Sequence, residues 1–409
     1  MGSSSTALGE FVSLVRGTTY KSAMLGQPGP VLLGLASIQR DGGFRDDNLK
    51  TYGGESAERL ILHRGDLYVS LKDVTQSGDL LGAVSRVPAH IALGRLTQDT
   101  VKLEFDGDHD WRGYVYWVLR TPEYRSYCRA RAIGTTNLSL SREDFLAFEV
   151  PALTTERRSL VATLEALDDK IELNQKMSQT LEATVETIFR RRFVEFAGQS
   201  IDSHTGVPCG WRIVPFSESV RVLSGGTPKT SVDDYWGGDI PWFAIADAPE
   251  SGGVFVLDTA KKTTPLGIAN SAAQVLPAGT TILTARGTVG LRAIAGVDMA
   301  INQSCFGLRG RRPGTDYYTY AATGLVVDRL RRYSHGSVFS TINRSTFTSV
   351  SVIDPPADEV HMYEHAVKPL MDRIRQNGEE SRALGELRHA LLPRLFSGEH
   401  TGQEVKRSL

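Results

Sequence analysis

Cysteine is scarce in this chain of 409 residues, which contains only Cys128, Cys209 and Cys305, far apart and without a Cys-x-x-Cys pair. An odd number of isolated cysteines argues against a disulfide framework and against a cysteine zinc site. Apolar runs are also short, and none approaches the roughly 20 residues that a membrane-spanning helix needs. Residues 1–11 have neither the basic start nor the apolar stretch of a signal peptide. We therefore expect a cytoplasmic protein.

Net charge is almost absent, because 46 Lys and Arg residues oppose 47 Asp and Glu residues, which gives −1. This balance weighs weakly against nucleic-acid binding, since such domains are usually basic. Residues 206–356, however, carry 14 basic and 11 acidic residues. From charge alone, ordinary scatter is the favoured explanation of that excess. The chain also lacks a G-x-x-x-x-G-K-[ST] loop, so we expect no ATP site in it.

Glycine and proline are missing from residues 152–197, although the chain has 40 glycines and 17 prolines. The stretch is predicted to be one helix of about 40 residues, roughly 60 Å long. Its apolar positions alternate in steps of four and three, which is the spacing of a coiled-coil seam. The predicted seam residues, interrupted also by Ser178, are Leu160, Leu164, Leu167, Ile171, Asn174, Leu181, Val185 and Ile188.

The second half of the chain repeats the first at an offset of about 203 residues. LDDKIELN at 167–174 aligns with LMDRIRQN at 370–377, and GTTNLSLSREDF at 134–145 aligns with GSVFSTINRSTF at 336–347. A second long helix is therefore predicted within 357–396. Its seam residues would be Leu370, Ile374, Asn377, Leu384 and Leu391, and Pro369, Gly378, Gly385 and Pro393 predict that it is kinked or frayed.

Two long helices separated by a compact segment pair most simply as an antiparallel coiled coil. Asn174 and Asn377 then either fix the register as buried amides or lie at the seam's edge in water. The globular segments mix short strands with helices. The strands are expected at 31–38, 66–71, 281–285 and 293–295, and the helices at 114–131 and 317–332.

The predicted fold class is α+β, with two mixed α/β domains joined by two long helices that form the antiparallel coiled coil. A globule-plus-helix unit used twice predicts pseudo-twofold symmetry. Such symmetry suits a target that has two halves itself, as duplex DNA does. The predicted regions are a first globule at 1–151, a central helix at 152–200, a second globule at 201–356, and a C-terminal helix with a tail at 357–409.

Several long segments, in order, resemble the DNA-specificity (S) subunit of type I restriction-modification systems. LDDKIELNQKMSQTLEATVETIFRRRFVEF is similar to the family's central conserved region, and LGELRHALLPRLFSGE to its C-terminal one. GGTPKTSVDDYWGGDIPWFAIAD, GTTILTARGTVG and GSVFSTINRSTF are similar to segments of its target-recognition domains. The resemblance covers nearly the whole chain, although the first globule departs more from the pattern.

The resemblance implies a bacterial or archaeal protein without catalytic residues, metal or cofactor of its own. In the family, each target-recognition domain reads one half of a bipartite DNA site, and the paired helices space the domains. The helices also recruit two methyltransferase (M) subunits, which use S-adenosylmethionine to methylate adenine. Separate restriction (R) subunits translocate and cut unmodified DNA with ATP and Mg²⁺. The assembled complex would thus be both an adenine methyltransferase and an ATP-dependent endonuclease in host defence against foreign DNA.

Candidate DNA contacts follow from side-chain chemistry in predicted loops, because recognition domains vary most where they read bases. Arginine grips guanine or phosphate, asparagine reads adenine, and lysine or serine commonly holds phosphate. For each residue the alternative is a solvated loop position or a local cap. The candidates in the second globule are Lys229, Arg286, Ser337, Asn343 and Arg344. Their counterparts by the repeat are Lys72, in the place of Arg286, and Thr135, Asn137 and Arg142.

Two other interpretations stay open at this point. One is a fused methyltransferase or nuclease with its own catalytic site, against which the missing cofactor and nuclease motifs count. The other is a coiled-coil scaffold that binds protein and no DNA. His361-x-x-Glu364-His365 fits the H-x-x-E-H zinc pattern, but solvent-facing helix residues explain it better. Asp354-Pro-Pro lacks the aromatic residue with which adenine methyltransferases stack a flipped base.

Overall fold

The computed structural model of the chain describes residues 5–397 apart from 47–48, 76, 108–109, 136, 250–252 and 334–340. The chain divides into two compact units. Unit 1 is drawn from residues up to 169 and from residue 384 onward, and unit 2 from residues 170–383. Each unit therefore contains one globular part and a stretch of both long helices.

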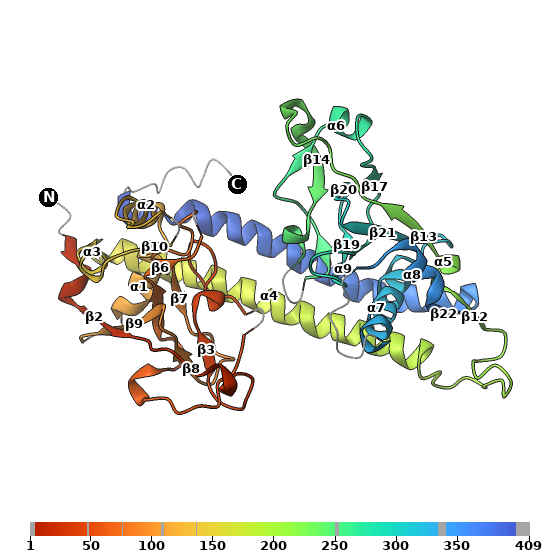
Figure 1. Cartoon of the computed structure of the whole chain (residues 1–409), viewed down its shortest axis with the longest axis horizontal. Coiled ribbons are helices and arrows are strands. Elements are labelled where there is room, and N and C mark those ends of the chain that lie inside the picture. The colour runs from red at the N-terminus through yellow and green to blue at the C-terminus, as the bar shows by residue number, and fades with distance from the viewer. Residues whose placement is uncertain are drawn as a thin grey trace. The chain divides into compact units, whose positions relative to one another are not determined.

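The long helices are α4, Thr155–Phe193, and α9, Ala357–Leu391, and they lie side by side (Figure 1). In unit 2, Arg192 near the end of α4 bonds to Glu359 near the start of α9, with Nε and Oε2 2.7 Å apart. In unit 1, Arg157 near the start of α4 donates from Nε to the carbonyl oxygen of Leu395, just beyond α9, at 2.8 Å. The pairing is antiparallel in both units, as the sequence predicted.

The second helix is not frayed at the predicted residues, because α9 runs unbroken through Pro369, Gly378 and Gly385. Pro369 lies on the exposed side of α9. Water can therefore solvate the backbone carbonyl that loses its helical partner. Only Pro393 coincides with an end, because α9 stops at Leu391 and the short helix α10 begins at Arg394.

The predicted seam residues divide into two groups by burial. Five are at most 3% exposed: Leu164, Asn174, Val185, Ile374 and Asn377. The others are half-buried: Leu160, Leu167, Ile171, Leu181, Ile188, Leu370, Leu384 and Leu391.

The heptad pattern missed several residues that α4 and α9 bury most deeply in unit 2. Phe189 and Phe193 follow Val185 on α4 in steps of four, and Tyr363, Val367 and Met371 lie opposite on α9. They belong to the core that the globular part of unit 2 shares with both helices. A helix that packs against a domain as well as against a second helix needs a buried face wider than a coiled-coil seam.

The globular part of unit 1 is built on a four-stranded antiparallel sheet with strand order β2-β9-β5-β7. A second sheet has the order β3-β8-β4, with β3 parallel to β8. The strands are β1 (Ser5–Ala7), β2 (Val12–Arg16), β3 (Val31–Leu33), β4 (Ile61–Leu62), β5 (Leu67–Ser70), β6 (Lys72–Asp73), β7 (Val84–Arg86), β8 (Gly94–Leu96), β9 (Thr100–Phe105), β10 (Leu138–Ser139) and β11 (Glu149–Pro151). The helices are α1 (Asp110–Val118), α2 (Pro122–Ala130), α3 (Arg142–Leu146) and α10 (Arg394–Ser397).

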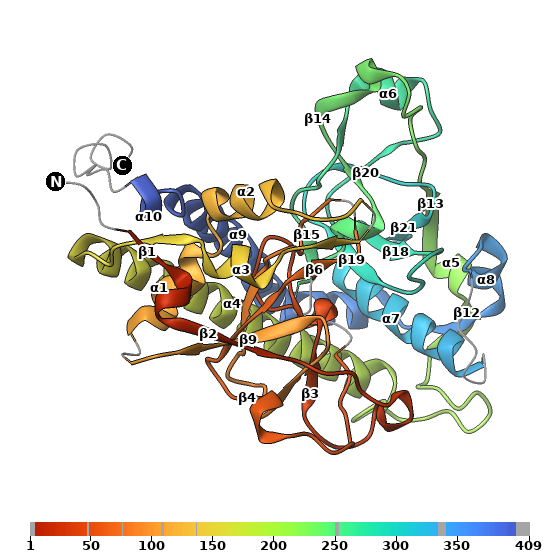
Figure 2. The same cartoon turned by 60° about the vertical axis from the view of Figure 1, so that its left-hand side comes forward.

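The globular part of unit 2 has a five-stranded sheet of order β13-β21-β18-β19-β15 and a four-stranded sheet of order β16-β14-β20-β17. Figure 2 shows α7 lying beside β19, β18 and β21. The strands are β12 (Arg212–Pro215), β13 (Val220–Ser224), β14 (Trp236–Phe243), β15 (Phe255–Val256), β16 (Lys262–Thr263), β17 (Val275–Leu276), β18 (Thr281–Thr284), β19 (Arg292–Ala295), β20 (Met299–Ile301), β21 (Cys305–Gly310) and β22 (Ser351–Asp354). The helices are α5 (Phe216–Ser219), α6 (Pro265–Ala269), α7 (Asp316–Tyr333) and α8 (Arg344–Ser349).

The two globular parts share one topology even where their sequences diverge. The order β2-β9-β5-β7 in unit 1 recurs in unit 2 as β13-β21-β18-β19. The parallel pair β3 and β8 recurs as β14 and β20, and the antiparallel pair β1 and β11 as β12 and β22. Phe145 in α3 and Phe347 in α8 are equivalent in the sequence repeat, and both are fully buried. The duplication thus covers the whole unit and not the long helices alone.

Two predicted elements differ from the structure. The helix expected at 114–131 is two helices, because Pro122 starts α2 and the Thr121 side chain caps it by accepting from the backbone N–H of Tyr124. The strand expected at 31–38 ends at Leu33 and continues as a short 3₁₀ turn at Leu35–Ser37. Pro122 marks the break between the two helices in the sequence, whereas no local signal in the sequence shows that the strand ends at Leu33.

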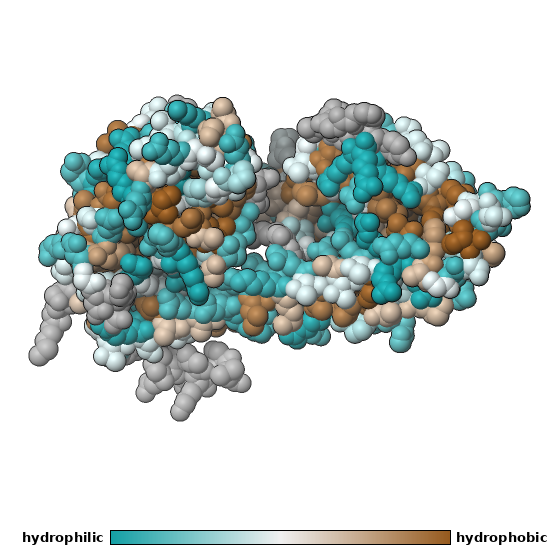
Figure 3. All heavy atoms as spheres, turned by 90° about the horizontal axis from the view of Figure 1, so that it is seen from below, coloured by the Kyte–Doolittle hydropathy of each residue, from teal (hydrophilic) through white to brown (hydrophobic). Residues whose placement is uncertain are grey.

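Apolar surface is scattered over the chain. Across the described ranges, no helix combines the length and the hydrophobicity that crossing a membrane requires. On the face drawn in Figure 3, hydrophobic residues form separate brown patches among hydrophilic teal ones. Such a scatter is normal for a protein surface in water.

Candidate nucleic-acid interface

In unit 2, Arg286 lies at one end of the five-stranded sheet, two residues after β18 ends. Ala285 is held in place from both sides: its N–H donates to Ser304 O at 2.8 Å, and its carbonyl accepts from Ile342 N at 2.9 Å. Arg286 itself is exposed, and it makes no hydrogen bond or ion pair with any residue that the structure describes. A rigid base therefore presents a free guanidinium at this end of the sheet.

Lys229 lies on the segment that leaves the same sheet end after β13. The Trp236 indole donates to the Lys229 carbonyl at 3.2 Å, which shapes the turn, while the lysine side chain is exposed. Lys261 is exposed as well, and its Nζ lies 5.9 Å from the centre of the Trp236 ring. One lysine backbone and one lysine ammonium thus lie beside the same indole.

Sequence reasoning missed both Lys261 and the exposed Gln303, which bonds to Thr227 near the start of the Lys229 segment. Neither residue follows a recognisable turn motif. Strand pairing alone brings them to the candidate surface, since β14 pairs with β16 on one side and with β20 on the other.

Two other predicted contacts have structural partners instead. The Asn343 side chain caps α8 by accepting from Thr346 N at 3.0 Å. Arg344 Nη2 donates to the carbonyl of Val222 at 3.2 Å and to the hydroxyl of Ser224 at 3.0 Å, which ties α8 to β13. These contacts favour a structural role for both residues. Ser337 lies outside the described residues.

In unit 1, Lys72 follows β5 in the way that Arg286 follows β18. Leu71 accepts from Leu140 N at 2.9 Å, which reproduces the bond between Ala285 and Ile342. Lys72 is exposed, but its Nζ lies 3.2 Å from Asp99 Oδ1. An anionic ligand would have to compete with that carboxylate for the lysine.

The remaining candidates in unit 1 lie beside this junction. Thr135 and Asn137 are exposed on the loop before β10, which pairs with the strand of Lys72. Arg142 is the exposed first residue of α3, the helix that Ser141 caps by accepting from Asp144 N at 2.9 Å. The structure thus brings the four unit 1 candidates to one loop cluster.

Asp354 and Glu364, from the methyltransferase-like and the zinc-like motif respectively, make structural contacts. Asp354 pairs with Arg212 and, at 2.7 Å, with Arg312. Glu364, in the zinc-like motif, accepts from Tyr318 N at 2.7 Å. In the described part of the chain, no group of three or more His, Cys, Asp and Glu residues is arranged to hold a metal ion.

The two buried cysteines are also poor nucleophiles. Burial raises the pKa of the Cys305 thiol to about 12, and burial likewise raises the pKa of the Cys128 thiol. Both groups are therefore protonated thiols near neutral pH, the less reactive form.

Comparison with known proteins supports the relationship that the sequence suggested. Residues 208–376 match the family model of the type I restriction modification DNA specificity domain. The chain is 22% identical over 347 residues to the type I restriction enzyme HindI specificity subunit of Haemophilus influenzae, a match that covers 68% of this chain and 74% of that protein. It is 24% identical over 192 residues to the MjaIX specificity subunit of Methanocaldococcus jannaschii, covering 46% and 44%.

The fold agrees with these sequence matches. The crystal structure of a type I restriction-modification S subunit from M. genitalium aligns with a TM-score of 0.53 at 13% identity, over 97% of this chain and 96% of that one. At that identity the alignment speaks for the fold alone, including the duplicated globule-plus-helix arrangement. Residues 208–376 thus match the type I restriction modification DNA specificity domain, and the chain is similar to type I restriction enzyme specificity subunits in sequence and to an S subunit in fold.

Proposed function

We propose that this chain is the sequence-reading subunit of a type I restriction-modification complex. It binds duplex DNA at a bipartite site, and the globular part of each unit reads one half-site. The observation that carries the proposal is the specificity-domain match at 208–376, in a chain whose first globular part repeats the topology of the second. Equivalent scaffolds with different loop residues suit the reading of two different sequences.

The proposed DNA contacts centre on Arg286 and Lys229 in unit 2 and on Lys72 and Arg142 in unit 1. The supporting observation for Arg286, Lys229 and Arg142 is an exposed cationic side chain on a loop or helix start fixed by backbone hydrogen bonds. Rigid loops keep the entropic cost of binding low, and cations near phosphate release counterions.

The proposal extends to the assembled complex. We propose that α4 and α9 dock two methyltransferase subunits, which supply S-adenosylmethionine and methylate adenine, and that restriction subunits supply ATP-dependent cleavage. The chain itself then contributes recognition and assembly. Methyl transfer by the isolated chain would contradict this division of labour and favour a fused enzyme.

Mapping methylated adenines in the source genome, before and after deletion of this chain, tests the proposal. We expect a bipartite methylated motif that disappears on deletion. Replacing residues 206–356 with the matching segment of a related subunit should change one half of that motif and leave the other. Unchanged methylation after either manipulation would refute the proposed function.

A further inference from the structure

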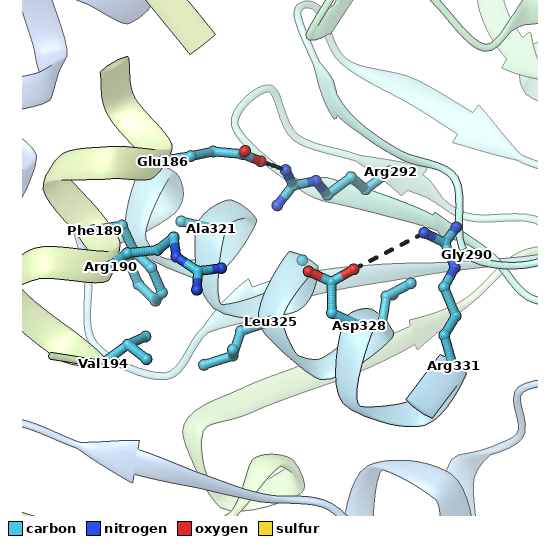
Figure 4. A pocket seen from close by; sticks show the side chains of 12 residues that line it. Glu186, Phe189, Arg190, Val194, Gly290, Arg292, Ala321, Leu325, Asp328 and Arg331 are labelled. Carbon is cyan, nitrogen blue, oxygen red and sulfur yellow. Dashed lines mark hydrogen bonds and ion pairs between the residues drawn. The ribbon is translucent and has the colours of Figure 1, made fainter. Parts of the chain in front are cut away.

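In unit 2, one arginine joins the five-stranded sheet to α4. Arg292 opens β19, and its guanidinium lies 4.4 Å from the centre of the Tyr320 ring on α7. It bonds to Glu186 on α4 (Figure 4). It also donates to the carbonyl of Tyr320 at 3.2 Å and lies 3.9 Å from Glu182. The Tyr320 hydroxyl donates to Glu182 at 2.7 Å. These four residues, called here the arginine clamp, connect β19, α7 and α4.

The interior of α7 is shaped to admit this guanidinium. A Cβ at Gly324 would lie 1.8 Å from Arg292 Nη1. Glycine inside a helix is unfavourable relative to alanine, so a specific packing requirement is needed to explain it. The arginine side chain is only 17% exposed. A charge this deeply buried is stable only with its partners in place, which makes the clamp geometrically specific.

The clamp lies at the base of the hairpin that carries Arg286. Gly290 N donates to Thr284 O at 2.9 Å, and Leu291 N donates to the Thr284 hydroxyl at 2.9 Å. Those bonds close the loop, and Arg292 follows it directly. The position of the candidate DNA-reading loop relative to α4 is therefore fixed within a few residues of its tip.

Beside the clamp, α4 and α7 separate around a hollow of about 250 Å³ (Figure 4). Its lining includes Phe189, Arg190, Val194, Leu325 and Asp328. Across the hollow itself α4 and α7 are not closely packed, so the polar clamp adds to the hold that the shared core around Phe189 and Tyr318 provides. Two residues before Tyr320, in the first turn of α7, the backbone N–H of Tyr318 donates to Glu364 on α9.

Unit 1 contains the same combination of side chains. Arg86 on β7, the strand equivalent to β19, lies over the Tyr116 ring of α1 at 4.6 Å and bonds to Glu165 on α4 at 3.1 Å. A Cβ at Gly113 of α1 would lie 2.9 Å from that glutamate's Oε1. Strand arginine, helix tyrosine, α4 glutamate and helix glycine thus recur in both units, although the positions are not matched by the sequence repeat.

We propose that the arginine clamp of unit 2 is a positioning device that sets the angle of the second recognition domain on α4, and with it the half-site spacing that the subunit accepts. This inference rests on the proposed function. Because α4 continues into the residues of unit 1, a loosened domain would tolerate other spacings. One base pair changes the separation of two half-sites by about 3.4 Å and their rotation by about 35°.

The test uses the full chain assembled with its methyltransferase partners, and the motif found by methylation mapping. Affinity is measured for duplexes with the native spacer and with spacers one base pair shorter and longer. In Arg292→Gln and in the double variant Glu182→Gln/Glu186→Gln, the preference for the native spacer should fall by about tenfold, while native-site affinity changes by less than about threefold. The ratio is unaffected by a fraction of misfolded protein, since both affinities use the same active molecules.

Arg292→Lys keeps the charge but loses the planar fork, so it should show an intermediate preference. The matched control is Glu379→Gln, which breaks the exposed pair with Arg375 on α9 and should keep the wild-type ratio. An unchanged ratio in both Arg292→Gln and the double variant would overturn the inference. If the wild-type complex itself shows no bipartite preference, the proposed function fails, which is a distinguishable result.

Discussion

Asn377 donates a hydrogen bond to the hydroxyl of Ser178 at 3.1 Å, between the two antiparallel long helices of unit 2. Asn174 makes the equivalent contact with Ser381 at 3.4 Å. Both pairs are related by the 203-residue offset, so the local pseudo-twofold axis passes between them. The two asparagines are at most 2% exposed. The structure thus favours a buried amide pair over residues at a wet seam edge.

Replacing both amides, as Asn174→Leu/Asn377→Leu, should raise the free energy of unfolding by about 1–3 kcal/mol, because each Oδ1 is buried without a partner among the described residues. Chemical denaturation of the full chain measures this change. Gln376→Leu, an exposed position on the same helix, is the control and should change stability by less than about 0.5 kcal/mol. A destabilised double variant would mean that the adjacent hollow of about 150 Å³, which both asparagines line, holds water bound to these oxygens.

Two helical glycines, Gly385 in α9 and Gly324 in α7, should respond to alanine in opposite directions. Gly385→Ala meets no atom within 4 Å and should stabilise α9 by about 1 kcal/mol through helix propensity. Gly324→Ala would press on Arg292 Nη1 and should lower the melting temperature despite the same propensity gain. Thermal unfolding of the two variants beside the wild type decides the matter. Equal stabilisation of both would show that the guanidinium relocates without cost.

Stability should also depend on pH through Glu364. Burial raises the pKa of this carboxyl to about 7, and the hydrogen bond from Tyr318 N only partly opposes that rise. A folded-state pKa above the unfolded one means that the folded chain binds the proton more tightly, so this contribution to stability is fully present at low pH and is lost as pH rises through 7.

The variant Glu364→Gln should therefore remove this part of the decline in unfolding free energy between about pH 4.5 and 7, and should exceed the wild type at pH 8 by at most about 3 kcal/mol. Urea denaturation at several pH values measures the difference. Glu379→Gln, an exposed site on the same helix, should follow the wild-type profile. Parallel profiles for Glu364→Gln and the wild type would contradict the prediction.

For DNA binding by the assembled complex, Arg286→Gln should lower affinity. If the guanidinium contacts phosphate, the slope of log affinity against log salt should fall by about one; if it reads guanine, discrimination at one base should drop by about 1–3 kcal/mol. Arg311→Gln removes an exposed arginine at the opposite end of β21 and is the control. If Arg286→Gln and Arg311→Gln change DNA affinity equally, the DNA does not bind specifically at the sheet end that carries Arg286.

By contrast, Arg344→Gln should act on stability. It removes the bonds from α8 to Val222 and Ser224, which are worth about 1 kcal/mol together, and should lower the melting temperature with little change in DNA affinity per folded molecule. Affinity measured against the folded fraction separates the two effects. If the variant instead loses DNA affinity while its melting temperature is unchanged, Arg344 contacts DNA.

The long helices could be predicted because their signals are local: seam spacing, and the absence of glycine and proline from residues 152–197. Pro369 misled the prediction, since its cost depends on which face of α9 it occupies. Asn343 and Arg344 were chosen for their chemistry, which serves a helix cap or a strand contact as well as it serves DNA. The partner of Arg292 lies 106 residues away on α4, so no local pattern could reveal it.

The duplicated globule-plus-helix organisation could be predicted from the amino-acid sequence, because short-range periodicity and internal repetition are local properties of the chain. Which cations are exposed and which are paired, and which glycines make room for a side chain, became clear from the folded structure. Burial and charge pairing depend on residues that folding brings together from distant positions, so Arg286 and Arg292, six residues apart, have different environments.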